Sequence, residues 1–179
     1  SDLESEEYRN MHRLVVNKIK SRFPVNTSLK LFPFSIKKNS NIYGIIFGSK
    51  NYAAVDKFLN IAWKRNELNG EADFDIDEDS VKGQLNIFGD KELTKKEKFQ
   101  IELEKKILEK DFVSNKQILI YTYENGHIPI HASEVLKAMK KENKVYYNSP
   151  SPYLTYVNVF RKENIITYKI IISQIYKQL

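Results

Sequence analysis

The sequence predicts a protein of mixed α/β class built from two parts. In the first half, helical spacing of apolar residues alternates with two strand-like runs, whereas the second half predicts three helices followed by a hairpin. Residues 1–90 hold 13 Lys/Arg and 13 Asp/Glu, while residues 91–179 hold 16 Lys/Arg and 10 Asp/Glu. The whole net charge of +6 therefore belongs to the second half, and we place a domain boundary between residues 90 and 91.

Composition excludes several classes of protein. The chain of 179 residues is 41% hydrophobic and has no cysteine, so it can bury a core but cannot form disulfides, thiolate metal sites or cysteine nucleophiles. Its longest apolar runs are far shorter than the roughly 20 residues of a membrane-spanning helix, and no apolar signal core begins the chain. We expect a cytoplasmic protein. Because the chain begins Ser-Asp rather than Met, we also expect it to be cut from a longer chain or processed.

The first half is expected to contain a helix, two strands joined by a polar turn, and a second helix. These elements are predicted over residues 3–23, 29–36, 42–47 and 52–66. The first helix places its apolar residues at spacings of three and four, namely Tyr8, Met11, Leu14, Val15, Ile19 and Phe23. The second strand is apolar throughout, which predicts burial on both of its faces.

The segment 71–79 alternates apolar with acidic residues, as a strand with one acidic face does. Asp73, Asp75 and Asp77 have the spacing of the first three ligands of an EF-hand loop. That loop needs glycine where this chain has Glu78 and a glutamate where it has Gln84. We therefore predict an edge strand or a hairpin whose acidic side chains prevent edge pairing, and no metal site.

The second half predicts the order of elements found in a winged helix. Helices are expected over about 94–110, 115–123 and 131–142, a hairpin from 145–147 and 156–160, and a final strand or helix over 165–179. In such a fold one helix enters the major groove of DNA and the hairpin, or wing, touches the backbone. His127 and His131 flank Pro129, which breaks any shared helix, so we predict no metal site there either.

A basic set of side chains falls on the third helix and after the predicted wing strand. Its members are Lys137, Lys140, Lys141, Lys144, Arg161 and Lys162. Lysines neutralise phosphate without reading sequence, and residues 91–179 hold a single arginine, so contact with the DNA backbone is the expected mode. The alternative is a solvated charged face on a module that docks another protein or forms a homodimer.

Several stretches resemble the C-terminal region of the three-Cys-motif partner proteins of bacteria and phages. The matching residues are Ile42-Tyr43-Gly44-Ile45-Ile46-Phe47-Gly48-Ser49-Lys50, Asp56-Lys57-Phe58-Leu59, Ala62-Trp63-Lys64, Asn69-Gly70-Glu71-Ala72, Phe74-Asp75-Ile76-Asp77, Glu124-Asn125-Gly126-His127, His131-Ala132 and Glu134-Val135-Leu136. Together they cover most of residues 42–145. The resemblance implies the tail of a Rossmann-like, methyltransferase-like domain over 1–90, followed by a winged-helix-like domain over 91–179.

Under this resemblance the two strands would end a doubly wound sheet, and the cofactor loop of a methyltransferase would lie upstream. No two glycines of this chain form the G-x-G turn of such a loop, so we expect no cofactor and no catalytic residues in it. The expected partners are DNA, a partner protein or the missing N-terminal domain, and no membrane. The alternative is the non-catalytic portion of a methyltransferase-like enzyme, or a docking and dimerisation module.

Overall fold

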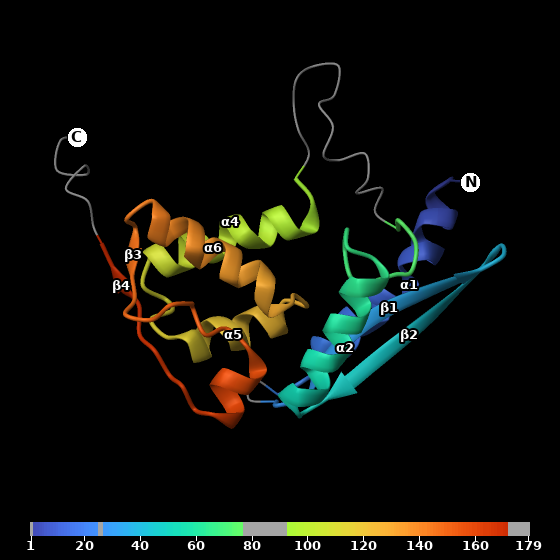
Figure 1. Ribbon diagram of the computed structural model, residues 1–179. Coiled ribbons are helices and arrows are strands. Elements are labelled where there is room, and N and C mark those ends of the chain that lie inside the picture. Colours follow the sequence, from blue (N-terminus) through green and yellow to red (C-terminus); the bar gives the residue numbers. More distant parts are fainter. Residues whose placement is uncertain (1, 25–26, 77–92, 172–179) are drawn as a thin grey trace, which may run out of the picture. The chain divides into compact units, whose positions relative to one another are not determined.

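The computed structural model describes residues 2–24, 27–76 and 93–171, which belong to two compact units, 1–95 and 96–179 (Figure 1). Both units combine helices with strands, which confirms the mixed α/β class. The predicted boundary between residues 90 and 91 falls in the segment 77–92, outside the described residues, and stays a prediction. No helix of the described part is long and apolar enough to cross a membrane.

Unit 1 is built around an antiparallel hairpin of β1 (Lys30–Lys38) and β2 (Asn41–Ser49). The turn between them contains Asn39, whose φ of 57° is tolerated better by asparagine than by most residues. Both strands were predicted from the sequence, and each is longer than expected because the polar residues beside the turn also pair. Residues 71–73 join the other side of β1 through a parallel bridge between Ser35 and Ala72.

One helix covers each face of this hairpin. On one face lies α1 (Asp2–Lys20), where a Cβ added to Gly44 would come within 2.7 Å of the His12 Cβ. The His12 ring also lies about 3 Å from the hydroxyl of Ser35, and both residues are buried, so this Ser–His contact packs the helix on the sheet. On the other face lies α2 (Tyr52–Arg65).

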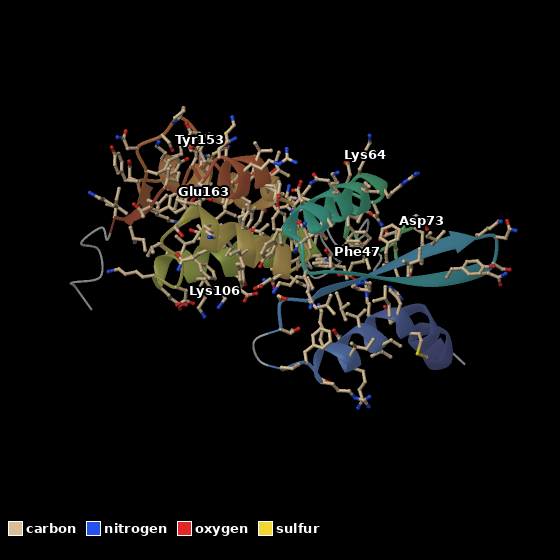
Figure 2. The ribbon with its side chains drawn as sticks, turned by 90° about the horizontal axis from the view of Figure 1, so that it is seen from below. Phe47, Lys64, Asp73, Lys106, Tyr153 and Glu163 are labelled. Atoms are coloured by element: carbon tan, nitrogen blue, oxygen red, sulfur yellow. The ribbon has the colours of Figure 1, made fainter. Side chains whose placement is uncertain are left out.

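Aromatic packing holds α2 against the hairpin. Phe47 of β2 and Phe58 of α2 stack with ring centroids 4.2 Å apart, and Figure 2 shows Phe47 between the strand and the helix. Phe32 and Phe34 of β1 also contact Phe58. Beyond the helix, Gly70 has a φ of 65° and lies against the Trp63 ring, where any side chain would collide.

The prediction that β2 is buried on both faces was wrong. Tyr43, Ile45 and Ile46 are 52%, 43% and 39% exposed. The sequence correctly predicted an apolar strand, but among the described residues β2 pairs with β1 alone, and its far edge pairs with no other described strand. The apolar face predicted for α1 is also less buried than expected. His12 and Val16 are buried, His12 contacts Ser35 and Lys20 lies over the ring of Phe32. The predicted apolar face is left half exposed at Met11, Leu14, Val15 and Ile19.

The acidic segment follows its predicted alternation only in part: Phe74 and Asp75 are both partly exposed, and the described residues join β1 through a single bridge and not as a strand. Ala72 and Ile76 are buried, whereas Asp73 is exposed and accepts a hydrogen bond from the backbone N–H of Lys37 at 2.7 Å. Asp77 lies outside the described residues. At the start of the segment, Glu71 lies between two cations.

The carboxylate of Glu71 binds Arg13 of α1 at 2.6 Å and the Nζ of Lys95 at 2.5 Å. Lys95 also donates to the carbonyl of Asn69 and lies 5.4 Å from the ring centroid of Trp63. The three charged side chains are only 21–23% exposed. This ion cluster therefore ties α1 and the end of unit 1 to the segment beside β1.

Unit 2 contains a trio of helices, two very short strands and a helical turn. Their bounds are α4 (Lys95–Leu108), α5 (Asn115–Glu124), α6 (Pro129–Lys141), β3 (Val145–Tyr146), η1 (Val157–Arg161) and β4 (Lys169–Ile170). The predicted helices agree with α4, α5 and α6 to within a few residues. Their inner faces form the core of the unit, with Phe99, Leu103, Ile107, Ile118, Leu119, Tyr123, Leu136 and Met139 buried.

The strand pairing of unit 2 differs from the prediction. β3 pairs with β4, antiparallel, and not with residues 156–160. Those residues lie largely in η1, a π-helical turn that packs against α5. The chain before β4 also pairs with the start of α5 through an antiparallel bridge between Ser114 and Thr167.

Candidate nucleic-acid interface

The local sequence fixes how α5 turns into α6. The Ser114 hydroxyl accepts a hydrogen bond from the backbone N–H of Gln117, and the Gln117 side chain accepts one from the backbone N–H of Ser114. These two bonds form a capping box at the start of α5. After α5, Gly126 takes a φ of 72°, a conformation that glycine adopts without strain. Pro129 then begins α6, at the position where proline costs a helix no hydrogen bond.

Two histidines fill the turn between these helices. His127 and His131 are both buried, their Nδ1 atoms lie 3.1 Å apart, and the His127 ring stacks on Phe99 at 4.0 Å. A contact between two Nδ1 atoms requires one to donate and the other to accept. His131 is a first-turn residue of α6, as predicted, and His127 belongs to the core. No cluster of three or more metal-ligating side chains occurs among the described residues.

The α6 helix has a buried face and an exposed face. Ala132, Val135, Leu136 and Met139 pack inward, whereas Ile130, Glu134, Lys137, Ala138 and Lys141 are exposed. Glu134 binds Lys96 at 2.8 Å and accepts from Gln100 of α4. Burial opposes ionisation of Glu134, but these two partners outweigh it and lower the pKa of that carboxyl. The negative charge near the start of α6 is thus neutralised, and the outer face of the helix is basic toward its end.

Lys140 and Lys144, two of the six predicted basic residues, have hydrogen-bond or ion-pair partners within unit 2. The Nζ of Lys140 donates to the carbonyls of Tyr147 and Ser149 and lies 4.0 Å from the Tyr147 ring centroid. Lys144 binds Glu104 at 2.7 Å and Glu142 at 2.6 Å, and these hydrogen bonds raise the pKa of Lys144. Both lysines therefore hold the end of α6 and the start of β3 in place.

The structure brings the remaining four predicted residues to two different elements. Lys137 and Lys141 lie on the exposed face of α6, whereas Arg161 and Lys162 lie at the end of η1. Within unit 2, η1 is the short orange-red helix below α5 in Figure 1, while the end of α6 lies above α5 beside β3. Arg161 is 5.7 Å from the Tyr156 ring centroid. The predicted basic set is therefore divided between α6 with its following turn and the end of η1.

One basic residue near α6 was missed from the sequence. Lys169 is exposed on β4, where it pairs with Tyr146 of β3, and Ile171 donates to the carbonyl of Lys144. Because α6 also packs against β3, Lys169 belongs to the same end of unit 2 as Lys141. No local pattern marks it, since its position depends on the pairing of β4 with β3. We call Lys137, Lys141 and Lys169 the basic end of unit 2.

The segment between β3 and β4 folds back on α5 and is held by Asn115. The buried Asn115 side chain donates to the carbonyls of Asn164 and Tyr153 at 2.8 and 3.3 Å, and accepts from the N–H of Ile166 at 3.1 Å. Tyr153 and Glu163, labelled in Figure 2, both have a φ of 51°, which bends the chain sharply near each end of η1. The segment 147–168 is consequently a compact loop and not an extended hairpin.

Comparison of the chain with protein-family models, with curated proteins and with solved structures yields no match. The functional conclusion therefore depends on the geometry of the two units.

Proposed function

We propose that unit 2 is a winged-helix module that binds the backbone of duplex DNA through α6. The observation that carries this proposal is the order of its elements. Residues 113–114 pair with residues 167–168, which come directly before β4, and β4 pairs with β3. The stretch that runs through 167–168 into β4 is therefore flanked by residues 113–114 and by β3. In the chain, α4 comes before this sheet, and α5 and α6 lie between its first segment (113–114) and its second (β3). This is the order of elements in a winged helix.

The charge distribution supports contact with phosphate. Lys137, Lys141 and Lys169 are exposed at one end of the unit, and an exposed lysine can neutralise one phosphate without reading a base. The compact loop 147–168 places Arg161 and Lys162 beside α5, where they would meet a different part of the backbone. Binding that is weak and indifferent to sequence is the expected behaviour.

Replacing Lys137 and Lys141 with alanine should weaken DNA binding strongly. If the three lysines of the basic end each meet a phosphate, the logarithm of the affinity falls against the logarithm of salt concentration with a slope of about −2.7. The double variant should show a slope of about −0.9, which is an affinity about 60-fold lower near 0.1 M salt. Fluorescence anisotropy of a labelled duplex across a salt series measures both quantities.

A matched control removes the same charge from another helix. Lys98 and Lys105 are exposed on α4, and their double alanine variant should keep the slope of the unmodified chain. Equal losses in both double variants would mean that net charge alone binds DNA, and the proposed surface would be rejected. A chain that retains no DNA at low salt would favour a docking module instead.

The Rossmann-like assignment of unit 1 belongs to the same proposal. Helices on both faces of a hairpin with an apolar edge strand support a slice of a doubly wound sheet. The resemblance to three-Cys-motif partner proteins and the cytoplasmic location stay predictions. In this proposal the chain needs no cofactor, and the alternative of a non-catalytic portion of a methyltransferase-like enzyme assigns unit 1 the same role.

A further inference from the structure

The outer edge of β2 has the properties of a strand that another strand covers. Asn41–Ser49 contains no charged residue and no proline, and its nine pairs with β1 run without a bulge. Among the described residues no strand pairs with its other edge. Solvent-exposed edges in proteins are ordinarily protected by charges, prolines or bulges, and β2 has none of these protections.

The apolar flank of α1 lies on the same side as this open edge. Arg13 reaches Glu71, whose segment pairs with β1, so the Arg13 side of the helix faces away from β2. At about 100° per residue, Met11 and Val15 lie on the opposite flank, which is the β2 side.

Ile46 belongs to the same surface. Ile46 lies two residues after Gly44 on β2, so both are on the face that α1 covers, and Ile46 is 39% exposed. Met11, Val15, Ile19 and Ile46 therefore form an exposed apolar strip along the open edge, which we call the edge strip.

The charge of unit 1 permits two copies to meet at this edge. Residues 1–95 carry a net charge of only +1, with 15 basic and 14 acidic residues, whereas the remaining +5 belongs to residues 96–179. Because β2 itself is uncharged, antiparallel pairing of two copies places no like charges opposite one another within the strand. An antiparallel pair has a two-fold axis perpendicular to the sheet, so the same surface serves both copies.

The dimensions of the unit fit such a pairing. The α1 helix packs on both strands of the hairpin, so it lies over the middle of the pair. With strands about 4.8 Å apart, the middles of two edge-paired hairpins are about 9.6 Å apart. Packed helices have axes about 8–10 Å apart, so the two α1 helices would contact each other through their edge strips.

We propose that β2 of one chain pairs antiparallel with β2 of a second copy, forming a symmetric dimer with a continuous four-stranded sheet between the hairpins. Full overlap of the two strands places Ile45 opposite its own copy on the axis. On the same face, Tyr43 lies opposite Phe47 of the other copy.

Sedimentation velocity of the full chain without DNA tests this dimer. The unmodified chain should sediment as a dimer at micromolar concentration, and Val15→Lys and Ile46→Lys should each raise the dissociation constant by at least about tenfold, a change of 1.4 kcal/mol. Ile101→Lys is the control, because Ile101 is 56% exposed on α4 of unit 2. Circular dichroism verifies that the variants remain folded.

The absence of cysteine gives a second measurement. Ile45→Cys should form a covalent dimer on mild oxidation, because residues facing each other in antiparallel strands have Cα atoms about 4.5–5.5 Å apart, within disulfide range. Ile101→Cys should crosslink far less. A further strand of the proposed doubly wound sheet would occupy the same edge, so the dimer and that sheet exclude each other at β2. A chain that stays monomeric up to about 100 μM, well above the micromolar range expected of a specific dimer, would overturn the dimer and favour the further strand. A dimer whose dissociation constant is unchanged in both Val15→Lys and Ile46→Lys would overturn the proposal as well.

Discussion

Replacing Asn115 with alanine is expected to destabilise unit 2 by about 3 kcal/mol. The side chain is fully buried and satisfies three backbone groups, which belong to Tyr153, Asn164 and Ile166. Alanine leaves all three without that partner, and each buried group left unsatisfied costs about 1–3 kcal/mol. We take the low end of the summed cost because water can reach parts of the loop once it loosens.

The two units can be followed separately in urea. The single tryptophan, Trp63, is buried in unit 1, whereas circular dichroism follows the helices of both units. In the Asn115→Ala variant the dichroism transition should begin at lower urea, and the tryptophan transition should not move. Lys116→Ala, an exposed change one residue away, should shift neither. An Asn115→Ala variant within about 0.5 kcal/mol of the unmodified chain would show that Asn115 does not hold the loop.

Replacing Glu71 with glutamine should destabilise unit 1 by about 3 kcal/mol. The substitution keeps the shape of the side chain but leaves Arg13 and Lys95 beside a neutral group. Removing one partner of a buried ion pair costs about 3–5 kcal/mol, and we take the low end because these side chains remain 21–23% exposed. Trp63 fluorescence reports this loss directly, and Glu67→Gln, an exposed change, is the matched control.

The same cluster should make unit 1 sensitive to acid. Burial alone would raise the pKa of Glu71, but the cations of Lys95 and Arg13 outweigh burial and hold that pKa below its ordinary value. A carboxyl with a lowered pKa in the folded state stabilises the fold above its unfolded pKa, about 4.3, and loses that contribution as pH falls through the folded value. The difference in stability between the unmodified chain and Glu71→Gln should therefore shrink below about pH 4. A difference that is constant from pH 7 to pH 3 would contradict the role of the charge.

The elements that depend on neighbouring residues were predicted well. Pro24, the polar turn at 37–41, Asn125-Gly126 and Pro129 each act on the chain within a few residues, and the helices and strands of the structure end close to them. Apolar spacing likewise located the helices, because it reflects the geometry of a single element. The basic side chains of α6 were found for the same reason.

The errors concern contacts between distant parts of the chain. The pattern of β2 shows an apolar strand but not whether a further strand covers its edge, and the pattern of α1 shows an apolar stripe but not which flank meets the sheet. Residues 156–160 have strand-like composition, yet Asn115, some forty residues earlier, holds the flanking chain so that they coil against α5. Lys140 looks as available as Lys141 in the sequence, and only the fold of the loop brings Tyr147 to it.

The loop 147–168 also determines the order in which unit 2 opens. β3 and β4 are two residues long, so their pairing alone cannot offset the chain entropy lost in closing a long loop. The pairing persists only while the loop stays docked on α5. In native-state hydrogen exchange, the amides of Tyr168 and Ile171 should therefore lose protection together and earlier than those of α5, as one cooperative unit at the low-stability end of the domain.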